Sequence, residues 1–248
     1  MVAQGGTWHH GLIAEWWAHF NTDGPKIEEY GRVVADAQPA LDAGCGAGRL
    51  LVPWLRAGYD VDGCDVSEDM LDRCRERARR EGFEPTLWAT PLHELRPPRR
   101  YRTIVCCGTF GLGSTHEQDE EALRRLREAL EPGGTLILDH EVARPGQFRI
   151  DTPLPAPWPE RGDRRRAADG SEYELRVRRL DVDEADRSET LEIRAWKWDA
   201  AGRLLAEETR ELSMRSYPRD ELARMFERAG FAVADTAGEE ILRYDLTH

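Results

Sequence analysis

The residues whose types and spacing best suit chemistry form a glycine-rich stretch. Residues 41–48 read Leu-Asp-Ala-Gly-Cys-Gly-Ala-Gly and lie between an expected strand and an expected helix. Glycines at such a turn let the backbone approach a ligand closely, and the following helix presents free N–H groups. The spacing is GxGxG, whereas dinucleotide sites use GxGxxG, and Asp42 lies two residues before the first glycine. Because a carboxylate repels phosphate, the stretch favours a cationic group such as an α-ammonium.

A second carboxylate follows the next expected strand. Asp65 lies 17 residues after Gly48, within the strand expected over residues 59–66. An acid at this end of the second strand can accept hydrogen bonds from both hydroxyls of a ribose. S-adenosylmethionine has both an ammonium group and an unphosphorylated ribose, so it fits these two carboxylates. We expect it as the cofactor, with S-adenosylhomocysteine as its product. The alternative is a glycine turn that serves tight packing alone.

Four segments carry a resemblance to a known family: LDAGCGAGRL, VDGCDVSEDML, LEPGGTLILD and YPRDELARMFERAGF. On these motifs the sequence resembles the class I S-adenosylmethionine-dependent methyltransferases, over about residues 12–142 and more weakly at the last motif. The resemblance implies a Rossmann-like, doubly wound α/β sheet. Within the family the chain is similar to the small-molecule branch, which includes sugar-amine N,N-dimethyltransferases and glycine N-methyltransferase-like enzymes.

The resemblance also implies which residues hold the cofactor. The glycine loop, which includes Cys45 and Gly48, surrounds the methionine part. By motif position the contacts are Asp42, Ala43, Gly44 and Gly46 for the methionine part, Asp65 for the ribose, Val66, Met70 and the Leu92 backbone N–H for the adenine, and Cys107 and Gly108 beside the methyl group.

One position departs from the family pattern. The family often has an acid just before the Leu92 position, where it accepts from the adenine amine, but Thr90 and Pro91 stand there. Either the Thr90 hydroxyl or a main-chain carbonyl replaces the acid, or the contact is missing. Arg49 follows the glycine loop and can reach the methionine carboxylate, a carboxylate of the N-terminal segment, or solvent.

Aromatic residues ahead of the first strand suggest a cover for the cofactor. Trp16, Trp17, Phe20 and Tyr30 lie in residues 1–38, where relatives place a helix or lid that keeps water out. Aromatic residues on an amphipathic helix also form ordinary core, so both interpretations stand. Of these residues, we assign Trp17 and Tyr30 to the cofactor site.

Three residues are candidates for binding or deprotonating the methyl acceptor. His140 and Glu141 follow the fifth expected strand, and open α/β sheets bind ligands beyond the carboxyl ends of their strands. Tyr217 precedes the last expected helix, and His116 is a further, weaker candidate. An unperturbed histidine pKa of about 6.5 suits proton removal. A base is needed for a hydroxyl acceptor and is nearly dispensable for a neutral amine.

Alternating strand-like and helix-like segments over residues 39–144 predict a parallel sheet with helices on both faces. Later segments alternate in polarity over residues 173–182, 189–198 and 204–216, which predicts a three-stranded antiparallel insertion. The arginines at 164–166 are expected in a solvated loop. We therefore expect one methyltransferase domain with a helical lid (1–38), a cofactor-binding core (39–144), a proline-rich loop and insertion over the acceptor (145–216), and a last helix with a strand pair (217–248).

Composition narrows the choice of partners. The 248 residues include 35 Lys and Arg against 47 Asp and Glu, a formal charge of −12, which is the wrong sign for gripping nucleic acid. Five cysteines form no CxxC pair, so neither a disulfide framework nor a metal site is expected. No apolar run reaches the roughly 18 residues of a membrane span, and no signal segment is visible. We expect a cytoplasmic monomer or homodimer without membrane contact.

These observations favour methyl transfer to a nitrogen or oxygen of a small-molecule acceptor, by in-line displacement with exclusion of water. Three alternatives stay open: a methyltransferase that acts on RNA or protein, a nucleotide-dependent oxidoreductase, and a non-catalytic S-adenosylmethionine-binding module. The charge of −12 disfavours the first, and the loop spacing with Asp42 disfavours the second. No motif names the acceptor.

Overall fold

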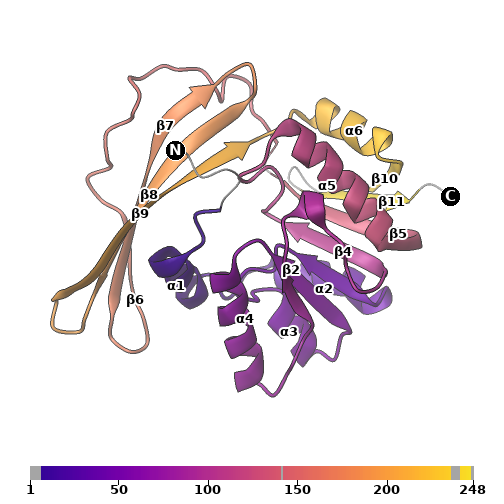
Figure 1. Cartoon of the computed structure of the whole chain (residues 1–248), viewed down its shortest axis with the longest axis horizontal. Coiled ribbons are helices and arrows are strands. Elements are labelled where there is room, and N and C mark those ends of the chain that lie inside the picture. Colours follow the sequence, from indigo (N-terminus) through magenta and orange to yellow (C-terminus); the bar gives the residue numbers. More distant parts are fainter. Residues whose placement is uncertain (1–6, 141, 236–240, 247–248) are drawn as a thin grey trace.

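The computed structural model describes residues 7–140, 142–235 and 241–246. Its main sheet has seven strands in the order β10-β11-β5-β4-β1-β2-β3 (Figure 1). This order continues outward on both sides of β1, which is the doubly wound arrangement that the alternating pattern predicts. The parallel strands are β1 (Ala40–Ala43), β2 (Val61–Asp65), β3 (Leu87–Ala89), β4 (Tyr101–Cys107) and β5 (Leu130–Asp139), and β10 (Phe231–Asp235) and β11 (Ile241–Leu246) add two antiparallel strands.

Helices cover both faces of this sheet. One face packs against α2 (Lys26–Asp36), α3 (Leu51–Arg56) and α4 (Glu68–Arg80). The other face packs against α5 (His116–Ala129) and α6 (Arg219–Arg228), and a short 3₁₀ turn, η1 (Leu92–Glu94), follows β3. Across the described ranges, no helix combines the length and the apolar character needed to cross a membrane.

The central strands are apolar because both of their faces are covered. All four residues of β1 are buried, and β4 is buried from Thr103 to Cys106. β1 pairs in parallel with β2 and with β4, and β4 pairs in parallel with β5. The carboxyl ends of these four strands therefore meet at one edge of the sheet, where the residues that follow them gather.

A second sheet of four antiparallel strands contains the predicted insertion. Its strands follow the order β6-β7-β8-β9, and β7, β8 and β9 correspond to the three segments of alternating polarity. The prediction of three strands with the arginines in a loop was therefore wrong in one respect, because the arginines form a fourth strand at the edge of the sheet. Arg164 and Arg166 lie in that strand and pair with Glu172 of the neighbouring strand. The bounds are β6 (Asp163–Arg166), β7 (Glu172–Asp183), β8 (Ser188–Trp198) and β9 (Leu204–Arg215).

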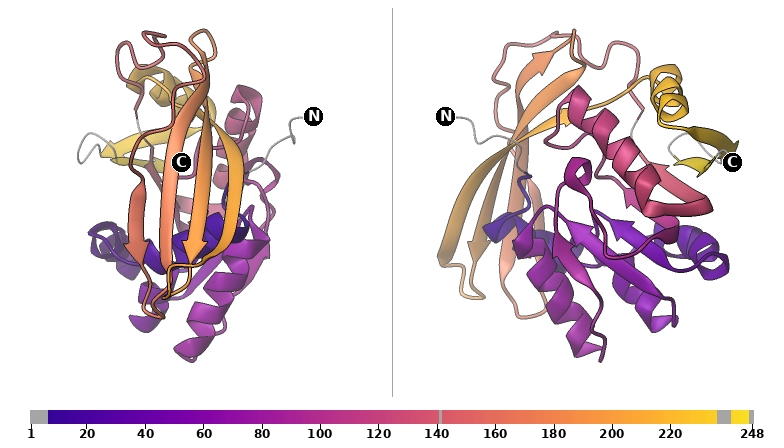
Figure 2. Two further views of the ribbon diagram at one scale, coloured as in Figure 1. Left: turned by 90° about the vertical axis from the view of Figure 1, so that its left-hand side faces the viewer. Right: turned by 45° about the vertical axis from the view of Figure 1, so that its right-hand side comes forward.

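The helix α1 (Gly11–Phe20) lies between the two sheets (Figures 1 and 2). Ile13 and Trp16 of this helix are buried against the insertion sheet, in one cluster with Tyr173 and Ile193. The helix α2 has a different position, because its buried residues pack against the main sheet. Only the first of the two N-terminal helices therefore lies over the carboxyl edge of the main sheet.

Candidate functional site

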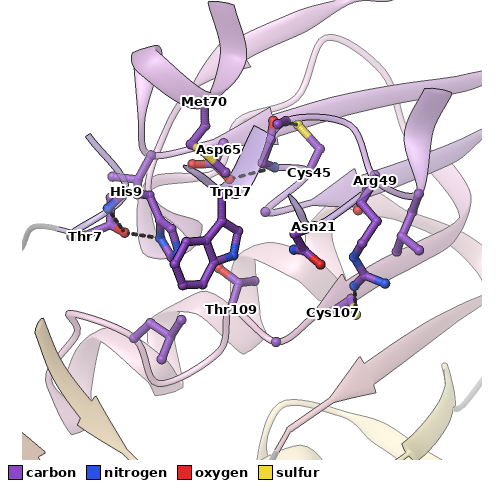
Figure 3. A pocket seen from close by; sticks show the side chains of 18 of the residues that line it. Thr7, His9, Trp17, Asn21, Cys45, Arg49, Asp65, Met70, Cys107 and Thr109 are labelled. Carbon is purple, nitrogen blue, oxygen red and sulfur yellow. Dashed lines mark hydrogen bonds between the residues drawn. The ribbon is translucent and has the colours of Figure 1, made fainter. Parts of the chain in front are cut away.

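A cavity of about 340 Å³ lies at the edge where the parallel strands end. Its floor is the glycine loop after β1 together with the ends of β2, β4 and β5, and its cover comes from the N-terminal segment and β9. Figure 3 shows side chains that line it, among them Trp17. The described residues that line it are Thr7, Trp8, His9, Trp17, Asn21, Lys26, Asp42, Gly44, Cys45, Gly46, Ala47, Arg49, Leu50, Asp65, Val66, Met70, Cys107, Gly108, Thr109, Leu112, Asp139, Leu212 and Met214.

Asp42 presents an unsatisfied carboxylate oxygen in this cavity. The residue is 1% exposed, and its Oδ2 atom is buried with no hydrogen-bond partner among the described residues. Burial raises the pKa of Asp42 to about 7, while the nearby Arg49 charge lowers it and the Asp65 charge raises it further. A buried polar atom without a partner is costly, so a ligand that donates a hydrogen bond here is stabilised. The α-ammonium group of S-adenosylmethionine fits this oxygen.

The glycine loop brings backbone and side chains into close contact. Gly44 has φ +86°, and a Cβ built there would lie 2.6 Å from Cγ2 of Thr109, which follows β4. A Cβ on Gly46 would lie 3.0 Å from the methyl carbon of Met70. Glycine at these positions therefore serves tight packing as well as close approach of a ligand. Tight packing alone was the alternative interpretation of the motif. Because a cavity lies beside the loop, the loop is also suited to bind a ligand.

Asp65 is positioned by two backbone N–H groups. The N–H of Gly46 donates to Oδ2 and the N–H of Ser67 donates to Oδ1, each at 2.9 Å. Ser67 in turn caps α4, since its side chain accepts from the N–H of Met70. Each carboxylate oxygen has a second lone pair, so Asp65 can still accept from two ribose hydroxyls. Burial raises the pKa of Asp65 above its usual value, and the backbone hydrogen bonds oppose that rise.

Of the expected adenine contacts, Val66 and Leu92 lie around a smaller neighbouring pocket of about 60 Å³, whereas Met70 lines the larger cavity. Val66 is 42% exposed, as expected for a residue that meets a ligand instead of core. The Thr90 hydroxyl donates to the Pro91 carbonyl at 3.2 Å, and its oxygen keeps lone pairs for an adenine amine. The structure thus brings Val66, Thr90, Pro91 and Leu92 together with Asp65 around this pocket.

A chain of polar contacts lines the end of β4. Arg49 Nη2 donates to Cys107 Sγ at 3.2 Å, and the Cys107 thiol donates to Asp139 Oδ2 at 3.1 Å. Lys26, at the start of α2, forms an ion pair with the same Asp139 oxygen. Burial raises the pKa of Cys107 to about 12, so its sulfur stays a neutral thiol at physiological pH. Arg49 is therefore inside the cavity, and not in solvent.

The N-terminal segment covers the cavity at the Asp65 end. His9 packs edge-on against Trp17 with ring centroids 4.8 Å apart, and Ser67 donates to the His9 carbonyl. Trp16 faces the insertion sheet and belongs to its core. Tyr30 of α2 is 1% exposed and does not line the cavity, because it packs in the core, with its hydroxyl close to Asp139. Of the two aromatic residues assigned to the cofactor site, the structure thus places Trp17 in the cavity and Tyr30 beneath it.

The structure gives His140 and Tyr217 positions in the core. Both ring nitrogens of His140 are engaged, Nδ1 with the Phe110 carbonyl at 3.2 Å and Nε2 with the Tyr217 N–H at 3.3 Å. Burial lowers the pKa of His140 to about 4. The Tyr217 hydroxyl donates to the buried Asp119, and neither residue lines the cavity. A general base needs a free nitrogen at the reacting group, so this geometry speaks against the proposed roles.

Glu141 and His116 are the other two candidates for binding or deprotonating the acceptor. Glu141 lies outside the described residues. The ring of His116 lies beside that of Tyr217, with centroids 5.7 Å apart, and does not line the cavity. Sequence reasoning missed Lys26, Asp139 and Thr109, which line the cavity from three elements. For Asp139 the available signal was its place at the end of β5, directly before the histidine that we selected.

The raised pKa of Asp42 predicts how donor binding depends on pH. A cationic ammonium group binds the ionised carboxylate, so a proton must leave Asp42 on binding wherever the pH is below about 7. We expect the affinity for S-adenosylhomocysteine to be constant above about pH 8 and to fall by up to about tenfold per unit below pH 7. His9, whose burial lowers its pKa to about 4, stays neutral in this range. Calorimetric titrations from pH 5.5 to pH 8.5 test this, and an affinity independent of pH would contradict it.

Part of the chain is similar in sequence to known proteins. Residues 40–134 match the family model described as a methyltransferase domain. The chain is 30% identical over 105 residues to a dTDP-3-amino-3,4,6-trideoxy-α-D-glucopyranose N,N-dimethyltransferase of Streptomyces venezuelae, covering 42% of this chain and 43% of that protein. It is 34% identical over 104 residues to a glycine/sarcosine N-methyltransferase of Halorhodospira halochloris, covering 40% and 38%. The chain thus spans less than half the length of these curated relatives.

Solved structures extend the similarity of fold to the whole chain. The structure of Streptomyces venezuelae DesVI superposes with a TM-score of 0.75 at 18% identity, covering 98% of this chain and 100% of that one. The sugar N-methyltransferase KedS8 from Streptoalloteichus gives a TM-score of 0.72 at 17% identity, with both chains fully covered. Residues 40–134 are therefore a methyltransferase domain, and the chain has the fold of the class I S-adenosylmethionine-dependent methyltransferases.

Proposed function

We propose that the protein transfers a methyl group from S-adenosylmethionine to an amine nitrogen of a small acceptor. The observation that carries this proposal is the buried, unpartnered oxygen of Asp42 in a covered cavity, with Asp65 across the glycine loop. The similarity to N-methyltransferases of amino sugars and of glycine supports nitrogen as the accepting atom.

The cofactor supplies an activated methyl group together with its own leaving group, so the chain's residues have to position and enclose the reactants. Asp42 and Arg49 offer opposite charges to the ammonium and carboxylate ends of an amino acid, and Asp65 offers two oxygens to a ribose. Trp17 and His9 pack edge-on in the lining of the site, where their rings would keep water from the reactants. Placement of this kind can supply about 7–11 kcal/mol of the barrier.

Acceptor chemistry other than amine methylation stays open to test. The chain is also 30% identical over 117 residues to a malonyl-[acyl-carrier protein] O-methyltransferase of Erwinia pyrifoliae, covering 46% of this chain and 41% of that protein. An O-methyltransferase that uses a hydroxyl needs a base, and His140, the histidine that we selected for this role, is buried away from the cavity. A neutral amine or a carboxylate reacts without a base, so the position of His140 is compatible with either acceptor.

A methyl-transfer assay tests the proposal. The full chain is incubated with S-adenosylmethionine and matched acceptors that bear an amine, a hydroxyl or a carboxylate on one sugar skeleton, with RNA and a lysine peptide as further arms. We expect S-adenosylhomocysteine and a methylated amine to accumulate together, faster than with any other acceptor. Donor binding without product in every arm would instead indicate a non-catalytic binding module, and product in the RNA or peptide arm alone would indicate a macromolecular acceptor.

A further inference from the structure

The cavity contains a third carboxylate that cofactor binding does not use. Asp42 lies in β1 and Asp65 is the last residue of β2, whereas Asp139 is the last residue of β5, two strands from β1 in the sheet. Its side chain is 8% exposed and lines the cavity. Among the described lining residues, it is the one carboxylate outside the two strands that position the cofactor.

Neighbouring side chains fix the orientation of this carboxylate. Asp139 pairs in register with Cys107 of β4, whose thiol donates to Oδ2 at 3.1 Å. Lys26 reaches the same oxygen from the start of α2. Both of these hydrogen bonds fall on Oδ2, and the Tyr30 hydroxyl of α2 is a further close neighbour of the carboxylate.

Part of the cavity lining is apolar. Leu212 and Met214 of β9 line the cavity from the insertion sheet, and Met214 forms a β-bridge with Leu112 of the loop after β4. Trp17 adds an aromatic wall from α1. A carboxylate beside apolar walls interacts strongly with a hydrogen-bond donor that carries positive charge, because little water screens the contact.

We propose that Asp139 binds the amine of the methyl acceptor, an inference that rests on the proposed function. The carboxylate accepts an N–H hydrogen bond and so directs the nitrogen lone pair toward the methyl carbon. As the N–C bond forms and the S–C bond breaks, positive charge moves from sulfur to nitrogen, and the ammonium product then loses its proton to water. A carboxylate beside the nitrogen stabilises that developing charge. An acceptor carboxylate or phosphate would be repelled at this position.

A pair of matched probes tests this role by binding alone. The full chain, saturated with S-adenosylhomocysteine, is titrated calorimetrically with 3-amino-3-deoxy-D-glucose and with D-glucose, which differ in one amine. We expect the wild type to bind the amine probe about tenfold more tightly, because a charge-assisted hydrogen bond is gained. Asp139→Asn should remove this preference and keep the affinity for S-adenosylhomocysteine. Asp181→Asn, the same change at an exposed position of β7, should leave both unchanged.

A second variant separates substrate binding from packing. Lys26→Met breaks the same ion pair but leaves the carboxylate, and we expect it to keep the amine preference. Loss of the amine preference in both variants would show that the ion pair is structural. Equal binding of the two probes by the wild type would also overturn the inference. So would weakened binding of S-adenosylhomocysteine by Asp139→Asn. Failure of the proposed function would give a different result from failure of this inference, because no amine would be methylated even though the donor binds.

Discussion

Replacing Asp42 with Asn is expected to weaken the binding of S-adenosylhomocysteine by about 1.5–3 kcal/mol, or roughly 10–100-fold. The exchange keeps the size of the side chain but removes its charge, and Oδ2 of Asp42 has no hydrogen-bond partner among the described residues. The ammonium group of the ligand therefore loses its negatively charged partner. Because burial raises the pKa of Asp42 to about 7, the variant should also lose the dependence of affinity on pH. Isothermal titration of both proteins at several pH values measures these effects.

A ligand that lacks the amino group provides the control. The wild type should bind S-adenosylhomocysteine far more tightly than its analogue without the α-amino group. The Asp42→Asn protein should distinguish the two ligands weakly, since the group that recognises the ammonium has gone. A full preference retained in the variant would place the ammonium elsewhere in the cavity.

Replacing Gly44 with Ala is expected to lower the free energy of unfolding by about 2–5 kcal/mol. Gly44 has φ +86°, a region that L-residues occupy at a cost of about 1–2 kcal/mol. A Cβ there would also lie between 2.6 and 2.8 Å from three side-chain atoms of Thr109, which would have to move. Because Thr109 lines the cavity, the displacement should weaken donor binding as well. Denaturant unfolding and calorimetry measure the two effects.

Gly108 offers a matched control for this prediction. It has φ +64°, and a Cβ built there meets nothing within 4 Å. Gly108→Ala therefore shares the cost of backbone strain and lacks the collision. We expect its loss of stability to be clearly smaller than that of Gly44→Ala, and equal losses would show that the contact with Thr109 relaxes freely.

The sequence predicted the main sheet well because its strands are apolar and its helices have clear ends. Ser67 caps α4, and the parallel strands β1, β2, β4 and β5 lie within residues 39–144, where the alternating pattern predicts them. The strand β6 was missed because all four of its residues, Asp163–Arg166, are exposed and charged. Such a strand has no apolar alternation, and it is held by pairing with β7 and by arginine–glutamate contacts.

The candidate site was predictable where spacing carries the information. Asp42 and Asp65 follow from their distance to the glycines, and the structure places both in the cavity. The choice of His140 in place of Asp139 shows the limit of this reasoning. Successive residues of an extended chain point to opposite sides, so at the end of β5 only one of the two can face the cavity. Asp139 faces it, and His140 points into the core beside Phe110.

The central claim is that the glycine loop holds an amino-acid sulfonium nucleoside and not a dinucleotide. Calorimetric titration of the full chain with S-adenosylmethionine, S-adenosylhomocysteine and NADH tests it most directly. We predict one site per chain for each of the first two ligands and no binding of the third, because Asp42 repels a pyrophosphate. Uptake of NADH with no response to either sulfur compound would contradict the account.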